Sequence, residues 1–267
     1  MSSDLFAVRS VLFLPASNPR AIVRARASAA DLVVLDLEDA VKPADKDEAR
    51  KAAVDAVASD WPMPVAIRIN GTGSKWHSLD IGAAARSACR FAVLARAGSA
   101  HLVREVREAI GKPLLAMVET AGGVLAAAEI AREAAALIAG TNDLSADLRL
   151  PSGVGRAPLQ TALQTIVLAA RAAGIAAFDG VYNRLTDLEG FAAECDEGRR
   201  LGFDGKSLIH PDQIEPCNRA FAPSAEEVER ARRLVEAFTG GAERFEDEMI
   251  ERMHVEAARR LLERAKA

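Results

Sequence analysis

The sequence predicts an α/β fold, a (β/α)8 TIM barrel followed by a C-terminal helical extension that serves as a lid or assembly element. Short apolar runs alternate with Ala-, Arg- and Glu-rich stretches that favour helix. Polar residues follow successive runs at intervals of 24 to 36 residues, enough for one strand, one helix and two loops. The 267 residues also suit one α/β barrel of about 250 residues with an extension.

Eight apolar runs supply the predicted strands. They are nearly continuous in apolar residues, as strands buried on both faces of a parallel sheet are. No Gly-rich fingerprint follows the first run, which continues as Ala16-Ser17-Asn18-Pro19, so an open dinucleotide-binding sheet is disfavoured. The runs are Val11–Pro15, Leu32–Leu37, Val65–Ile69, Phe91–Leu94, Leu114–Val118, Leu137–Ala139, Ala176–Val181 and Ser207–Ile209.

Capping-box patterns mark three helix starts, at Asp45 with Glu48, Thr186 with Glu189, and Ser224 with Glu227. We expect the barrel to occupy residues 1–221 and the extension residues 222–267. Within the extension, Ser224–Thr239 and Asp247–Lys266 are predicted as helices. The second carries an apolar stripe at helical spacing, formed by Met249, Ile250, Met253, Ala257, Leu261 and Leu262.

Composition excludes several classes of protein. Lys plus Arg is 34 and Asp plus Glu is 38, a net charge of −4, which excludes nucleic-acid binding through bulk charge. Three scattered cysteines without a CxxC favour neither a zinc site nor a disulfide framework. The start MSSDLFAVRS is unlike a signal peptide, and no apolar run approaches the roughly 18 residues that span a bilayer. We expect a cytoplasmic protein without a membrane partner.

Charged residues gather directly after the predicted strands. In a barrel the carboxyl ends of the strands form the catalytic face, so these side chains should converge. Carboxylates at one mouth repel unless a cation neutralises them, and Glu119 with Asp143 is the best pair for Mg²⁺. Arg68 suits bidentate recognition of a substrate carboxylate. The strand-end residues are Asp36, Glu38, Asp39, Arg68, Asn70, Glu119, Thr120, Asn142, Asp143, Asp179, Asn183 and His210.

A structural interpretation competes for each of these residues. Asp and Glu after strands often cap the following helix, because a helix N-terminus favours anions. Asp36 and Asp39 fit that role well, whereas Glu119 fits it less well. His210, which precedes Pro211, is predicted to anchor a loop rather than to act as a general base.

Six motifs occur in order along nearly the whole chain, and together they resemble the citrate lyase beta-subunit-like proteins of the HpcH/HpaI aldolase superfamily. That family has RSxLFxP, LDLEDAV, RxN, ET, GxxDL and GKxxIHP motifs. The matching segments here are Arg9–Pro15, Leu35–Val41, Arg68–Asn70, Glu119-Thr120, Gly140–Leu144 and Gly205–Pro211.

The resemblance implies a Mg²⁺-dependent carbon–carbon lyase. Such enzymes cleave or form a β-hydroxyacyl-CoA thioester of the citryl-, malyl-, methylmalyl- or citramalyl-CoA type. Retro-aldol chemistry gives a 2-keto acid and an acyl-CoA. The resemblance also implies a homotrimer or hexamer, and it suggests an acyl-carrier protein as a partner.

Residue roles carry over by position. Glu119 and Asp143 would hold Mg²⁺, and Arg68 would bind the keto-acid carboxylate and act in catalysis. Glu38 and Asp39 would be catalytic residues of the same site.

Further roles fall outside this cluster. Glu251, in the lid, would act as a catalytic acid or base. Asn70 and Arg9 are expected to bind substrate. Arg9, with Arg20 and Arg24, is a candidate for the CoA phosphates, and the alternative for these arginines is a solvated helix face.

Three positions depart from the family pattern. Arg96 stands where many members have the Lys of a Pro-Lys pair. Thr141-Asn142 replaces an acidic pair before the Asp of GxxDL. Glu251 replaces an Asp in the lid, which leaves open the thioesterase and synthase activities linked to that Asp.

Two other functions stay open at this stage. One is a class II pyruvate aldolase that does not use CoA. The LEDAV motif and the long extension count against it. The other is a non-catalytic partner subunit of a larger lyase complex.

Overall fold

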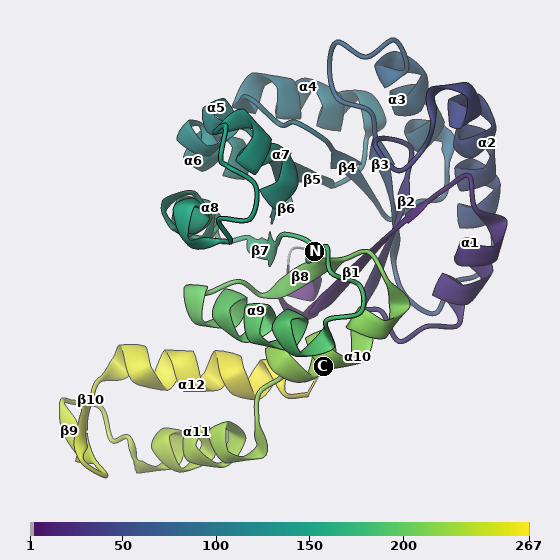
Figure 1. The fold of residues 1–267 in the computed structure, drawn as a ribbon. Helices are drawn as coiled ribbons and strands as arrows, with labels where there is room; N and C mark the ends of the chain where they lie inside the picture. Colours follow the sequence, from purple (N-terminus) through teal and green to yellow (C-terminus); the bar gives the residue numbers. More distant parts are fainter. Residues whose placement is uncertain (1–2, 267) are drawn as a thin grey trace. The chain divides into compact units, whose positions relative to one another are not determined.

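Eight parallel strands close into a barrel in the order β1 to β8, with β1 pairing to β8, in a computed structural model that describes residues 3–266 (Figure 1). The predicted TIM barrel is confirmed, and each predicted run coincides with a strand to within two residues at either end. The strands are β1 (Ser10–Pro15), β2 (Leu32–Asp36), β3 (Val65–Ile69), β4 (Phe91–Leu94), β5 (Leu114–Val118), β6 (Ala136–Ala139), β7 (Ala176–Asp179) and β8 (Gly205–Leu208).

Helices surround the ring of strands (Figure 1). Helix α4 illustrates how the sequence sets the ends and the buried face of such a helix. Ser99 caps its start, Val103, Val106 and Ile110 form its buried face, and left-handed Gly111 ends it. Among the described residues, no helix is long and apolar enough to cross a membrane. The helices of the barrel are α1 (Pro19–Arg26), α2 (Lys46–Val57), α3 (His77–Arg86), α4 (Ala100–Ile110), α5 (Ala121–Leu125), α6 (Ala127–Ala131), α7 (Thr141–Asp147), α8 (Gln160–Ala173), α9 (Leu188–Leu201) and α10 (Ile214–Phe221).

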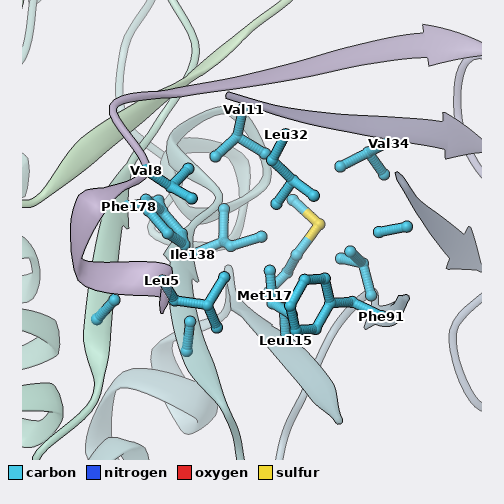
Figure 2. Packing of buried hydrophobic residues seen from close by; sticks show 14 of the residues in the cluster. Leu5, Val8, Val11, Leu32, Val34, Phe91, Leu115, Met117, Ile138 and Phe178 are labelled. Carbon is cyan, nitrogen blue, oxygen red and sulfur yellow. The ribbon is translucent and has the colours of Figure 1, made fainter. Parts of the chain in front are cut away.

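Alternate residues of the strands fill the barrel interior. Leu5 of the short 3-10 helix η1 (Ser3–Ala7) and Val8 join this core, and Figure 2 shows them packed with Ile138 and Phe178. Because successive side chains of a strand point to opposite faces, the core also identifies which strand-end residues face inward. The strand residues of this core are Val11, Phe13, Leu32, Val34, Ala66, Phe91, Val93, Leu115, Met117, Ala136, Ile138, Ala176 and Phe178.

The chain divides into two compact units between Ala220 and Phe221. The second unit consists of α11 (Ala225–Ala237), a hairpin of β9 (Glu243–Phe245) and β10 (Glu248–Ile250), and α12 (Arg252–Arg264). Ala231, Leu234, Ile250, Val255 and Ala258 form its own small core. The capping box of Ser224 and Glu227 at the start of α11 is confirmed.

The predicted helix over Asp247–Lys266 is wrong in its first five residues, which lie in the hairpin and at the cap of α12. The Glu243 carboxylate accepts N–H groups from Thr239, Gly240 and Gly241, and this closes the loop that leads into the hairpin. Met249 and Met253 are 70% and 59% exposed, so they do not belong to an apolar stripe.

The other two predicted caps differ in outcome. Asp45 is the N-cap of α2, as predicted, but its side chain accepts no capping hydrogen bond. The N-cap of α9 is Asp187, which accepts the N–H of Gly190, and not Thr186.

Candidate active site

A cavity of about 300 Å³ opens at the carboxyl ends of the strands. Asp36, Arg68 and Glu119 each stand two residues beyond a core residue of their strand, so alternation turns them into the barrel. The lining residues are Phe13, Leu14, Pro15, Asp36, Asp39, Ala40, Arg68, Met117, Glu119, Ala139, Gly140, Thr141, Asn142, Asp143, Val181, Ser207 and Ile209.

Asp36 holds Arg68 in a bidentate ion pair. The Arg68 Nε and Nη2 groups donate to the two Asp36 carboxylate oxygens over 2.6 and 2.5 Å. Asp36 also accepts the backbone N–H groups of Glu38 and Ala40 at 2.8 and 3.1 Å. Four hydrogen bonds therefore fix this carboxylate, and it orients the guanidinium while also ordering the turn after β2.

Glu38 approaches the same guanidinium from that turn. Its carboxylate lies 3.1 Å from Arg68 Nη1, and burial raises the pKa of Glu38 although the Arg68 charge opposes this. Burial lowers the pKa of Arg68, but the charge of Asp36 outweighs it and raises the pKa overall, so Arg68 is a permanent cation. Asp39 lines the cavity with an exposed side chain.

Glu119 is the most perturbed carboxyl group of the cavity. It is 2% exposed, and burial, reinforced by repulsion from Asp143, raises its pKa to about 7. Its Oε1 accepts the backbone N–H of Arg96 at 2.5 Å, and Arg96 adopts a left-handed backbone with φ of 54°. A Cβ at Gly140 would lie 2.3 Å from Glu119 Cβ, so only glycine leaves room for this side chain.

Asp143 lies in the first turn of α7, directly after β6, and its side chain is 36% exposed. Its Oδ1 lies 3.7 Å from Arg96 Nη1. Arg96 therefore contacts both predicted metal ligands, Glu119 through its backbone and Asp143 through its guanidinium. Beside them, Asn142 and Asn183 exchange amide hydrogen bonds of 2.7 and 3.2 Å.

The donor set of Glu119 and Asp143 fits a hard divalent cation. Within residues 3–266, no three His, Cys, Asp or Glu side chains gather as a metal cluster. Mg²⁺ requires fewer, because it binds one or two carboxylates and completes its octahedron with water and substrate oxygens. A buried carboxyl beside a second carboxylate is where a cation removes the most repulsion.

The structure corrects the expected role of Arg9 in substrate binding. Arg9 precedes β1, at the amino end of the strands and therefore opposite the cavity. Its Nε and Nη2 groups donate to the Asp31 carboxylate over 2.9 and 3.0 Å. This ion pair holds the guanidinium away from the site.

The expectation for Asn70 is also wrong. Asn70 is buried outside the cavity, and its amide is fully engaged. Its Nδ2 donates to Leu37 O and to Asp80 Oδ2, while its Oδ1 accepts from Lys46 Nζ at 2.8 Å. Asn70 thus joins β3 to α2 and α3.

Asp179 does not reach the cavity either. It follows Phe178 of the interior core, so alternation turns it outward. Arg156 binds it bidentately at 2.8 and 2.9 Å, and Lys206 Nζ lies 3.0 Å away. Burial alone would raise the pKa of Asp179, but these two cations hold it below its ordinary value.

His210 and Glu251 lie outside the cluster of Arg68, Glu119 and Asp143. His210 Nδ1 accepts the N–H of Asp212 at the start of a short 3-10 helix, which confirms its loop-anchoring role. Glu251 precedes α12 in the second unit, where it is exposed and its N–H donates to His254 Nδ1 at 3.0 Å.

Among the lining residues that were not predicted for the site are Phe13 and Ser207. Phe13 places its ring 5.4 Å from the Arg68 guanidinium carbon, and Ser207 lines the cavity from β8. Both sit at inward positions of their strands. Counting alternate residues back from the strand ends would have found them.

A conserved-sequence model of the HpcH/HpaI aldolase/citrate lyase family matches residues 9–211. The chain therefore belongs to this family, a class of barrel proteins whose members include aldolases and citrate lyases. Among individual relatives, the chain is 39% identical over 278 residues to a (3S)-malyl-CoA thioesterase of Cereibacter sphaeroides. That alignment covers 100% of this chain and 98% of the relative.

Two solved structures of Mycobacterium tuberculosis proteins are similar to this chain in fold and in sequence. Protein CitE in complex with magnesium, acetoacetate and coenzyme A superposes with a TM-score of 0.86, at 36% identity, covering 98% of this chain and 100% of that one. A citrate lyase beta subunit complexed with oxaloacetate and magnesium gives 0.75 at 37% identity, covering 82% and 100%.

Proposed function

We propose that this protein is a Mg²⁺-dependent carbon–carbon lyase that cleaves or forms a β-hydroxyacyl-CoA thioester. Its products in the cleavage direction are a 2-keto acid and an acyl-CoA. The observation that carries the proposal is one cavity lined by both Arg68 and the Glu119–Asp143 pair. The solved relatives with magnesium, coenzyme A and oxaloacetate support the same ligand classes.

Glu119 and Asp143 would hold the Mg²⁺ ion. The bound ion supplies Lewis-acid polarisation of substrate oxygens and neutralises the carboxylates around it. Gly140 and the Arg96 backbone place Glu119 for this role, because one gives it room and the other orients its Oε1.

Arg68 would bind the carboxylate of the keto acid. A guanidinium has five N–H donors. Asp36 accepts two of them, and a weak contact to Met117 Sδ at 3.6 Å takes a third, while the Glu38 carboxylate forms an ion pair with Nη1. One hydrogen on each of Nη1 and Nη2 is available to a ligand in the cavity, and the Asp36 pair fixes the plane of the guanidinium.

Retro-aldol cleavage requires two proton movements. The substrate hydroxyl loses its proton, the carbon–carbon bond breaks, and its electron pair moves onto the acyl-CoA half as an enolate. A proton then adds to the enolate carbon. Asp39, which lines the cavity, and Glu38, which pairs with Arg68, would serve these transfers, since carboxyl groups are used in acid–base catalysis.

The extension of residues 222–267 is proposed as a lid and subunit contact within a homotrimer or hexamer. Glu251 would supply an acid or base from this lid. The exposed Met249 and Met253 beside it support a contact role. Sedimentation at several protein concentrations tests the assembly, and a monomer throughout would contradict it.

Thioester hydrolysis is a second candidate, favoured by the 39% identical malyl-CoA thioesterase. The products separate the two reactions. Malyl-CoA gives glyoxylate and acetyl-CoA by cleavage, but malate and free CoA by hydrolysis. An acyl-carrier-linked substrate is a further variant of the lyase reaction.

The test is turnover of citryl-, malyl-, methylmalyl- and citramalyl-CoA with Mg²⁺ and with EDTA. We expect cleavage of at least one thioester, lost in EDTA and in Glu119→Gln. Turnover of free hydroxy-keto acids alone would replace the proposal with a CoA-independent class II aldolase. No turnover by folded protein would favour a partner subunit of a larger lyase complex.

A further inference from the structure

The Ser207 hydroxyl is a buried polar group without a protein partner. Ser207 is 1% exposed, and its Oγ has no hydrogen-bond partner among the described residues. It lines the same cavity as Arg68 and Glu119. Buried hydroxyls are normally paired, so this one calls for an explanation in terms of what the cavity binds.

The environment of β8 shows that Ser207 faces the cavity. Ser207 and Ile209 both line it, two residues apart as strand alternation requires. The residue before Ser207 on the strand, Lys206, points to the other face and is paired with Asp179 and Glu194 at 3.0 and 2.7 Å. The Ser207 hydroxyl is therefore separated from that charged network and directed at the ligand space.

Few side-chain donors line the cavity: besides Arg68 they are Thr141, Asn142 and Ser207. Ionised carboxylates only accept hydrogen bonds, and three of the five Arg68 N–H groups already have hydrogen-bond partners in the protein. Asn142 is engaged with Asn183. A 2-keto acid brings acceptor oxygens and no donors, so a neutral donor such as the unpaired Ser207 hydroxyl would add to the binding that Arg68 supplies.

We propose that Ser207 is a substrate-binding residue that donates its O–H to an oxygen of the bound 2-keto acid. This inference rests on the proposed function, because it takes the keto acid as the occupant of the cavity. Ser207 and Arg68 together then select ligands that place oxygens at both positions, since an analogue lacking one leaves a buried donor unpaired.

The experiment compares Ser207→Ala with the wild type by titration calorimetry, using pyruvate, glyoxylate and oxaloacetate in saturating Mg²⁺. We expect Ser207→Ala to weaken binding of the keto acid about tenfold, the size of one hydrogen bond to a charged group. Its Tm without ligand should not fall and should rise by about 2 °C, because an unpaired buried hydroxyl is removed.

Ser10→Ala is the matched control. Ser10 is also a buried serine, on the neighbouring strand β1, but its Oγ accepts the N–H of Asp31 at 3.0 Å. Removing this partnered hydroxyl should lower Tm and leave keto-acid affinity unchanged. The two variants should therefore shift Tm in opposite directions, and only Ser207→Ala should weaken keto-acid binding.

Equal keto-acid affinity in Ser207→Ala and wild type would overturn the Ser207 inference and leave the proposed function standing. Wild type that binds none of the three keto acids would overturn both. If Ser207→Ala does not fold, the crystal structure of the wild type with pyruvate decides. We expect Ser207 Oγ within about 3 Å of a ligand oxygen, and a separation too long for a hydrogen bond would refute the inference.

Discussion

Replacing Glu119 with Gln is expected to stabilise the metal-free protein above neutral pH. Burial raises the pKa of Glu119 from its ordinary value of 4.5 to about 7. That difference corresponds to about 3 kcal/mol between the charged and neutral forms. A neutral amide avoids this cost, provided that its oxygen keeps the hydrogen bond from the Arg96 N–H.

The effect depends on pH in one direction. A carboxyl group with a raised pKa holds its proton more tightly in the folded than in the unfolded state. Its contribution to stability is complete below about pH 4.5 and is lost as the pH rises through about 7. Glu119→Gln should therefore gain about 3 kcal/mol over wild type at pH 8, but less than about 1 kcal/mol at pH 5.

Urea denaturation in EDTA at both pH values measures this gain. Mg²⁺ should then stabilise the wild type and leave Glu119→Gln unchanged, because only the wild type keeps both ligands. Glu194→Gln is the control: its carboxylate lies 2.7 Å from Lys206 Nζ, so its loss should destabilise the protein at pH 8. An equal effect of Glu119→Gln at pH 5 and pH 8 would mean that the charge of Glu119 does not destabilise the fold.

Substitutions at Gly140, Asp179 and Arg96 test the surroundings of the site. Gly140→Ala should weaken Mg²⁺ binding at least about tenfold by calorimetry, since the added Cβ would meet Glu119. Gly122→Ala, with open space around the new Cβ, should not. Asp179→Asn should lower the free energy of unfolding by about 3–5 kcal/mol in urea, because two buried cations, Arg156 and Lys206, lose one of their carboxylate partners; a smaller loss would mean that Glu194, which also pairs with both cations, compensates. Arg96→Ala should be about 1 kcal/mol less stable than Arg96→Gly, because only glycine tolerates the left-handed backbone there without strain. Equal stability of the two would show that this backbone relaxes.

The barrel strands could be predicted because their physical signal is local. A parallel strand buried on both faces must be apolar at every position, and Leu32–Val34 shows this in successive residues. The hairpin at Glu243–Ile250 could not be predicted in the same way. Met249 and Met253 have helical spacing, but the loop closed by the Glu243 carboxylate determines the local conformation.

The candidate site could be predicted where the position of a residue on its strand determines whether its side chain points into the barrel. Asp36, Arg68 and Glu119 follow the inward alternation, and Asp179 follows the outward one, which the strand-end rule alone does not distinguish. Asn70 could not be placed, because Lys46 and Asp80 on other elements turn its amide away from the cavity.

A crystal structure of the protein with Mg²⁺ and pyruvate would show directly whether the metal and the keto acid share the cavity. We predict Mg²⁺ at about 2.1 Å from carboxylate oxygens of both Glu119 and Asp143. The keto-acid carboxylate should lie on the guanidinium of Arg68. Mg²⁺ bound away from this pair, or a keto acid bound without Arg68, would contradict the account.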